Sequence, residues 1–130
     1  DPDWGYETAW SIAREEADAI FAAGGETAVG ALRAAKDAKI HAIGVERDHR
    51  AALGEEGSGV AASIMGDASS TVRALIEAVK TGNPAEPRVD MVKFIPAGEA
   101  ISDSLFLEIN EILSGFANGS IKTNVTFEKQ

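Results

Sequence analysis

Apolar and polar positions along the chain change period several times, and each change predicts the border of a helix or a strand. Apolar side chains recur at helical spacing in three segments, residues 2–16, 27–38 and 102–116. Short apolar runs, which are typical of buried parallel strands, occupy residues 17–23, 40–45 and 60–65. Residues 88–96 alternate instead, so we expect a strand with one exposed face near the edge of the sheet.

A fourth helix is predicted after residue 67, where Asp67, Ser69 or Ser70 can cap it. Its apolar stripe predicts a buried face and consists of Val72, Leu75, Ile76 and Val79. The last helix, capped by Ser102 or Asp103 and stopped at Gly115 and residues 118–120, has a wider stripe. That stripe comprises Leu105, Phe106, Ile109, Ile112, Leu113 and Phe116. Residues 46–59 are charged and glycine-bearing and predict an irregular segment, and residues 121–127 predict a final short strand or an extended tail.

The order of these elements is helix, strand, helix, two strands, helix, strand, helix and strand. Such alternation predicts an α/β fold, a three-layer sandwich with a mostly parallel sheet. The 130 residues suffice for one domain, residues 1–130. Because the chain has no initiator Met, we expect it to be a processed product or a piece of a longer chain. Because it opens on a helix, we expect that a preceding strand is either lost or supplied by sequence outside these residues.

Composition narrows the classes of partner. The net charge of −9 disfavours nucleic acid and anionic membranes, which attract clustered Lys and Arg. Without cysteine the chain has no disulfide, thiol nucleophile or cysteine metal site. No apolar run approaches the length of a membrane-spanning helix.

Candidate binding residues follow two predicted strands. Parallel α/β sheets bind ligands at the carboxyl ends of their strands, where Gly24, Gly25, Glu26 and Thr27 and then Glu46, Asp48 and His49 occur. The first group can present backbone N–H groups at a helix N-terminus, or it can simply form a tight turn that caps the helix. The carboxylates of the second group can accept hydrogen bonds from sugar hydroxyls, or they can belong to a solvated acidic loop in which Arg47 neutralises either one.

Catalytic and metal chemistry is not indicated. His49, Glu46 and Asp48 are metal-ligand residue types, but nothing nearby completes a set of three or four ligands, so we predict no metal and no cofactor. No serine has a nucleophile elbow or a credible His and Asp partnership, so no catalytic residue is predicted. The aromatic side chains of Trp4, Tyr6 and Trp10 could stack on a planar ligand, although helical spacing favours a place in the core.

Five motifs in order resemble the second lobe of the basic membrane protein family, also called the purine nucleoside receptor A-like family. They are "DPDWGYETA", "ADAIF", "GGETAVG", "AAK" and "IGVERDH", and the segments 60–82 and 105–123 resemble the rest of that lobe. The chain departs from the family pattern at four positions. Glu26 and Ala28 replace turn glycines, Glu46 replaces the ribose-binding Asp, and Gly66 replaces a Lys.

The resemblance implies one lobe of a type I periplasmic binding protein, from a lipoprotein of an ABC transporter. It implies an extracytoplasmic location, no enzymatic activity, and a nucleoside or sugar-like ligand held in a cleft between two lobes. The implied partners are that ligand, a first lobe, an ABC permease and possible further copies of the chain. Because one lobe offers one wall of the cleft, we expect this chain alone to bind ligand weakly.

Two other functions stay open at this point. A stand-alone α/β interaction module could self-associate or dock on a partner chain, using the apolar surface or the sheet edge that a missing lobe or first strand leaves exposed. A small α/β enzyme acting on a sugar or nucleotide is the other alternative, which the lack of a nucleophile and of a metal set disfavours.

Overall fold

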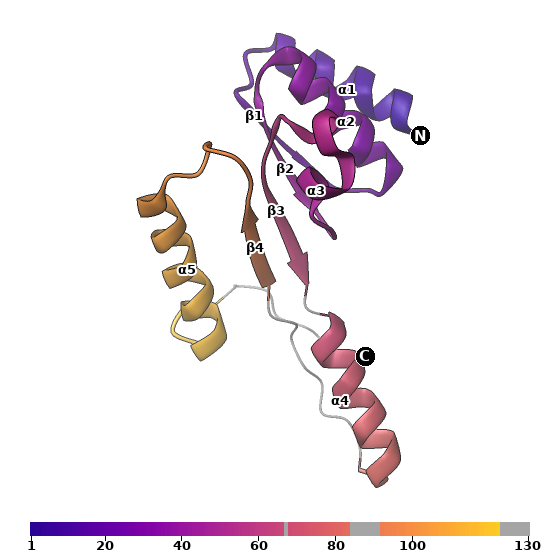
Figure 1. The fold of residues 1–130 in the computed structure, drawn as a ribbon, viewed down its shortest axis with the longest axis vertical. Helices are drawn as coiled ribbons and strands as arrows, with labels where there is room; N and C mark the ends of the chain where they lie inside the picture. The colour runs from indigo at the N-terminus through magenta and orange to yellow at the C-terminus, as the bar shows by residue number, and fades with distance from the viewer. Residues whose placement is uncertain (67, 84–91, 123–130) are drawn as a thin grey trace.

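In the part of the chain that the structure describes, four strands form one sheet in the order β1-β2-β3-β4. The computed structural model describes residues 1–66, 68–83 and 92–122 (Figure 1). In it β1 (Ala19–Ala22), β2 (His41–Val45) and β3 (Val60–Gly66) run parallel, while β4 (Val92–Pro96) pairs antiparallel with β3 at the edge. The predicted α/β fold with a mostly parallel sheet and a strand near its edge is therefore confirmed.

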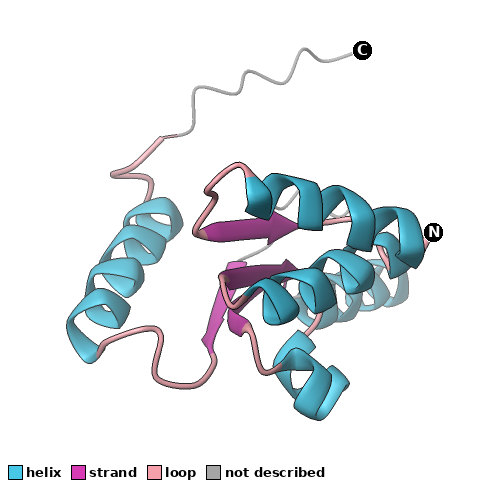
Figure 2. Cartoon of the chain, turned by 90° about the horizontal axis from the view of Figure 1, so that it is seen from above, coloured by secondary structure: helices cyan, strands magenta, loops and turns pink. Residues whose placement is uncertain are grey.

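Helices lie on both faces of this sheet (Figure 2). The helices α1 (Pro2–Arg14), α2 (Glu26–Ala38) and α3 (His49–Leu53) lie on one face, where α3 continues into the 3₁₀ turn η1 (Gly54–Gly57). On the other face α5 (Asp103–Asn118) lies against β4, with the rings of Phe94 and Phe106 6.4 Å apart. These are the three predicted layers. The second face is covered only in part, because Phe21 of β1 is 61% exposed, so the prediction that residues 17–23 form a fully buried strand is wrong.

Glycines let α1 and α2 cross with their backbones in contact. A Cβ at Gly5 would overlap the carbonyl group of Thr27, and a Cβ at Gly30 would overlap that of Pro2. The amino group of Asp1 also donates a hydrogen bond to Thr27 Oγ1 at 2.9 Å. Small residues at the crossing thus place the start of α2, and with it the loop before it.

The core between these helices and the sheet is built from small side chains. Its buried members are Ala9, Ile20, Ala22, Ala28, Leu32, Ala34, Ala35, Ala42 and Val60. Tyr6 and Trp10 stack with ring centroids 6.1 Å apart and pack against this cluster, as their spacing predicted. Trp4 instead is 64% exposed, so the expectation of a core position is wrong for this residue.

Tyr6 also ties α1 to α2, because its hydroxyl donates a hydrogen bond to Asp37 Oδ2 at 2.9 Å. This bond, followed by desolvation and the charge of Asp37, raises the pKa of the Tyr6 phenol above its ordinary value of 10.0. Tyr6 is the only tyrosine, so tyrosinate absorbance reports on it alone.

We expect Asp37→Asn to bring the pKa of Tyr6 back toward its ordinary value, measured by that absorbance. Since the folded-state pKa is the higher one, the bond stabilises the fold fully below the unfolded pKa, and this contribution is lost as pH rises through the folded pKa. The parent should therefore lose stability at alkaline pH more than the variant. A Tyr6 pKa unchanged by the substitution would contradict this assignment.

Two predictions of local structure are wrong. The segment 46–59 is not irregular, because Asp48 caps α3 by accepting a hydrogen bond from the Ala51 N–H at 3.0 Å, and η1 follows. The stop predicted at Gly115 is wrong, because α5 runs on to Asn118, whereas the stop predicted at residues 118–120 is confirmed by the left-handed Gly119 that ends the helix. Gly115 is buried within it because Ile121 folds back over it.

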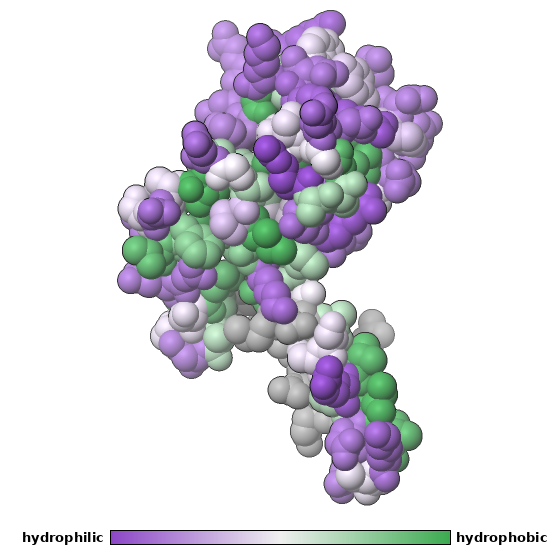
Figure 3. Space-filling model, in the orientation of Figure 1, coloured by the Kyte–Doolittle hydropathy of each residue, from purple (hydrophilic) through white to green (hydrophobic). Residues whose placement is uncertain are grey.

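The largest error concerns α4 (Ala68–Thr81), whose stripe was predicted to be buried. The helix lies apart from the sheet in Figure 1, and Figure 3 shows hydrophobic side chains along one side of it. The stripe residues are all exposed, Val79 to 83%. In α5 likewise Leu105, Ile112 and Phe116 are exposed, and only Phe106, Ile109 and Leu113 are partly buried.

Some expectations concern residues that the structure does not describe. Asp67 and residues 84–91 and 123–130 lie outside the described residues, which includes most of the predicted final strand and the first half of the run 88–96. Since α4 begins at Ala68, Ser69 and Ser70 lie inside its first turn and do not cap it. Within the described residues no helix is long and apolar enough to cross a membrane.

Candidate functional site

The parallel strands bring both groups of candidate residues to one edge of the sheet. The residues Gly24, Gly25, Glu26 and Thr27 follow the carboxyl end of β1, and Glu46, Asp48 and His49 follow that of β2. Because β1 and β2 are neighbours in the sheet, the two loops lie side by side. The sequence only suggested that the two groups lie close together. The order of the strands in the sheet is what makes them neighbours.

The first loop is a glycine turn that leads directly into α2. Gly24 and Gly25 have φ angles of +126° and +58°, in the left-handed region that favours glycine. No side chain caps α2, so the first-turn N–H groups at this end receive no hydrogen bond from a capping side chain. Glu26 stands in the first turn, where a carboxylate is favoured by the helix dipole.

The second loop presents Glu46 in an unusual backbone conformation. Its φ is +74°, which is uncommon for a residue other than glycine. The hydrogen bond from the Glu46 N–H to the Ile64 carbonyl oxygen, 2.9 Å long, holds this conformation at the end of β2. The side chain is exposed, and within residues 1–66, 68–83 and 92–122 it has no hydrogen-bond or ion-pair partner.

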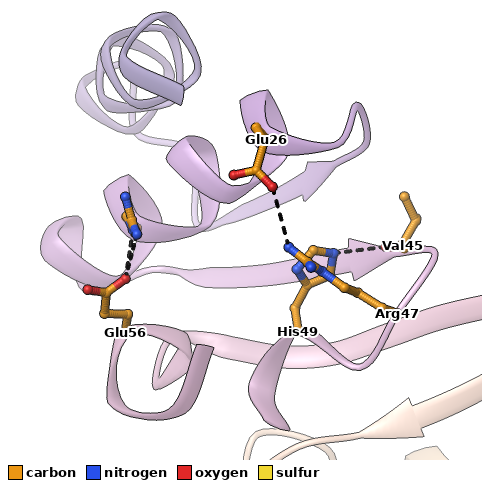
Figure 4. A network of polar contacts seen from close by, with 6 residues as sticks. Glu26, Val45, Arg47, His49 and Glu56 are labelled. Atoms are coloured by element: carbon orange, nitrogen blue, oxygen red, sulfur yellow. Dashed lines mark hydrogen bonds and ion pairs between the residues drawn. The ribbon is translucent and has the colours of Figure 1, made fainter. Parts of the chain in front are cut away.

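Arg47 joins the two loops. Its Nη2 lies 4.0 Å from Glu26 Oε1, and both side chains are at least half exposed (Figure 4). The sequence suggested that Arg47 would neutralise Glu46 or Asp48, and this is wrong, because β1 and β2 place the α2 N-terminus beside it. Asp48 in turn caps α3 through Oδ1.

His49 lies beneath this edge and is only 3% exposed. Its ring packs against Gly44, its Nε2 lies 2.8 Å from the Val45 carbonyl oxygen, and its backbone N–H donates to Ser63 Oγ at 3.1 Å (Figure 4). Because a carbonyl oxygen only accepts, Nε2 is the donor to Val45, and the buried Nδ1 has no hydrogen-bond partner among the described residues. His49 therefore supports the second loop from below. The sequence signal for this role is Gly44 of "IGV", because a residue without a side chain leaves room for the ring.

The described residues contain no group of three or more His, Cys, Asp or Glu side chains that could hold a metal ion. The edge carries the carboxylates of Glu26, Glu46 and Asp48 against one guanidinium, that of Arg47. Hydrogen bonding to hydroxyl or amine groups is the chemistry that such a set supports.

Comparison with known proteins identifies the family. The family model described as ABC transporter substrate-binding protein PnrA-like (Bmp) matches residues 1–91. The chain belongs to this Bmp family. None of the curated proteins matches it.

A solved structure supports the fold of this Bmp-family chain over almost its whole length. It is that of a transcriptional activator of the comK gene from Bacillus halodurans, with a TM-score of 0.76 and 20% identity over 93% of the present chain. The chain spans 44% of the length of that protein. At this identity the likeness concerns the fold alone.

Proposed function

We propose that this Bmp-family chain is the C-terminal lobe of a two-lobed, extracytoplasmic solute-binding protein of an ABC transporter. It binds a nucleoside or sugar-like ligand and catalyses no reaction on it. The carboxyl edge of the sheet forms one wall of the binding cleft, with Gly24, Gly25, Glu26 and Thr27 on one loop and Glu46 and Asp48 on the other. The predicted contact of His49 with the ligand is not kept, because its side chain is buried beneath the second loop and supports it from below. The observation that carries the proposal is the family match together with the open carboxylate of Glu46 at this edge.

The position of α4 supports the two-lobed arrangement. A helix of 14 residues is marginal in water unless its apolar face is packed. Here that face is exposed, while the solved relative of similar fold has more than twice the length of this chain. A further lobe that packs against α4 accounts for both facts.

The same exposed face favours a second candidate, an interaction module in which α4 contacts another polypeptide. Native mass spectrometry of the protein from its host separates the two. A retained nucleoside- or sugar-sized mass favours the receptor lobe, and an empty oligomer favours the module. A tight one-to-one ligand complex of this single chain would contradict the proposal that it supplies only one wall.

Glu46→Gln is expected to weaken the binding of ribonucleosides or free ribose about tenfold, because a hydrogen bond to a charged group contributes about 1.5–3 kcal/mol. The amide keeps the length of the side chain and removes its charge. Titrations followed by backbone amide chemical shifts measure this effect even for weak binding. Glu55→Gln, on the exposed turn η1, is the matched control and should leave the affinity unchanged. Equal affinities of Glu46→Gln and the parent would remove Glu46 from the site.

A further inference from the structure

A hollow lies at the opposite edge of the sheet from the candidate site, at the amino ends of β2 and β3. Its volume is about 490 Å³. The end of α2 forms one wall, Arg50 of α3 another, and residues 97–100 after β4 a third. None of the candidate residues of the carboxyl edge lines it, so it is separate from the site described above.

The charge of this hollow is opposite to that of the whole chain. Lys36, Lys39 and Arg50 line it against a single acid, Glu99, which leaves a net charge of +2 in a protein whose net charge is −9. Within residues 1–66, 68–83 and 92–122 none of the three cations forms an ion pair, although the chain has 21 Asp and Glu residues. Three unpaired cations around one hollow attract anions.

Arg50 is held in place by its own fold. Its Nη1 donates hydrogen bonds to the carbonyl oxygens of Ser58 at 2.6 Å and Gly57 at 3.4 Å. No other hydrogen bond of its guanidinium occurs among the described residues, so further donors remain for a ligand. A guanidinium fixed in this way loses little side-chain entropy when it binds an oxyanion.

The positive charge of the two lysines is larger than the partial negative charge of the helix C-terminus at which they lie. The C-terminus of α2 carries a partial charge of about −0.5, whereas Lys36 and Lys39 bring two full positive charges. Gly59 packs against the backbone of Lys36, where a Cβ would come within 2.9 Å of its Cα, so the start of β3 fixes this wall. The floor between the cations is apolar and includes Ile40, Val60 and Ala97.

We propose that this hollow binds a small multivalent oxyanion, a phosphate- or carboxylate-bearing molecule, through Lys36, Lys39 and Arg50. Inorganic phosphate and citrate are the probes, because the first tests binding of a phosphate group and the second tests binding of carboxylate groups. Whichever of them binds is expected to shift the backbone amides of Ser58, Gly59 and Gly98, and the binding should weaken as sodium chloride is added.

Lys39→Gly tests the site with two readouts of opposite sign. Lys39 ends α2 in the left-handed conformation, with φ of +60°, which glycine adopts without strain. The variant should therefore unfold at the same or a higher temperature than the parent, while its affinity for the anion falls about fivefold, as expected for an exposed charge. Lys80→Ala, which removes an exposed cation from α4, should leave the affinity unchanged.

Three results would overturn the proposal. The first is the absence of any shift at Ser58, Gly59 and Gly98 with either probe at tens of millimolar. The second is an equal loss of affinity in Lys39→Gly and Lys80→Ala, which would indicate unspecific attraction. The third is an anion-induced shift confined to Gly25, Glu26 and Thr27, which would place the anion at the N-terminus of α2 instead.

Discussion

Gly30→Ala is expected to lower the free energy of unfolding by about 3 kcal/mol, because the new methyl group would occupy the position of the Pro2 carbonyl oxygen. The backbones of α1 and α2 cannot separate without losing the packing of Ala9, Tyr6 and Trp10 on the core. Urea unfolding followed by circular dichroism measures the loss.

Gly66→Ala is the matched control for this substitution. A Cβ at Gly66 meets nothing within 4 Å, so the stability should change by no more than about 0.5 kcal/mol. A Gly30→Ala chain as stable as the parent would show that α1 does not pack on α2 as described. Equal losses in both variants would show that the effect is not specific to the helix crossing.

Gly44→Ala is expected to cost about 2 kcal/mol through a different clash, because its methyl group would overlap the ring of His49 at Cδ2. The displaced ring would also give up the contact between Nε2 and the Val45 carbonyl oxygen, and the second loop of the site would lose its support. Unfolding free energies of the single and double variants measure this coupling.

The double variant Gly44→Ala/His49→Ala separates the clash from a general intolerance of β2. Since His49→Ala removes the ring, Gly44→Ala should cost at least about 1 kcal/mol less in that background. Strictly additive losses would contradict the contact between Gly44 and His49. The same variants allow a comparison of amide shifts at Glu46 and Asp48, which should move in Gly44→Ala if the ring positions that loop.

Part of the candidate site followed from the sequence because it depends on local order. Two glycines between a short apolar run and an alanine-rich run predict a turn from β1 into α2, and the structure has it at Gly24 and Gly25. The apolar run before Glu46 predicts a strand that ends there, and β2 does end at Val45. Both results rest on periodicity and on glycine, which act within a few residues.

Contacts between different helices and strands could not be predicted from the sequence in this way. Arg47 pairs with Glu26 rather than with its sequence neighbours because β1 and β2 are adjacent in the sheet. The cations of the hollow at the amino ends of β2 and β3 come from the end of α2 and from α3, and they line it together with residues 97–100, a set that no local pattern joins. The role of His49 likewise depends on Gly44 and Ser63, which β2 and β3 bring beneath it.

For the apolar stripe on α4, the sequence predicted the helix and its apolar face, and only the tertiary structure decided whether that face is buried. Val72, Leu75, Ile76 and Val79 were enough to predict a helix with an apolar face, because that pattern requires only the helical period. What covers the face depends on where the chain carries the helix, and here it leads away from the sheet. By itself, therefore, the sequence determined the α/β order, the family and the two loops, since these depend on period, glycine and motif order. Only the tertiary structure decided which side chains are buried, paired or left free, since burial and pairing arise between segments that are distant along the chain.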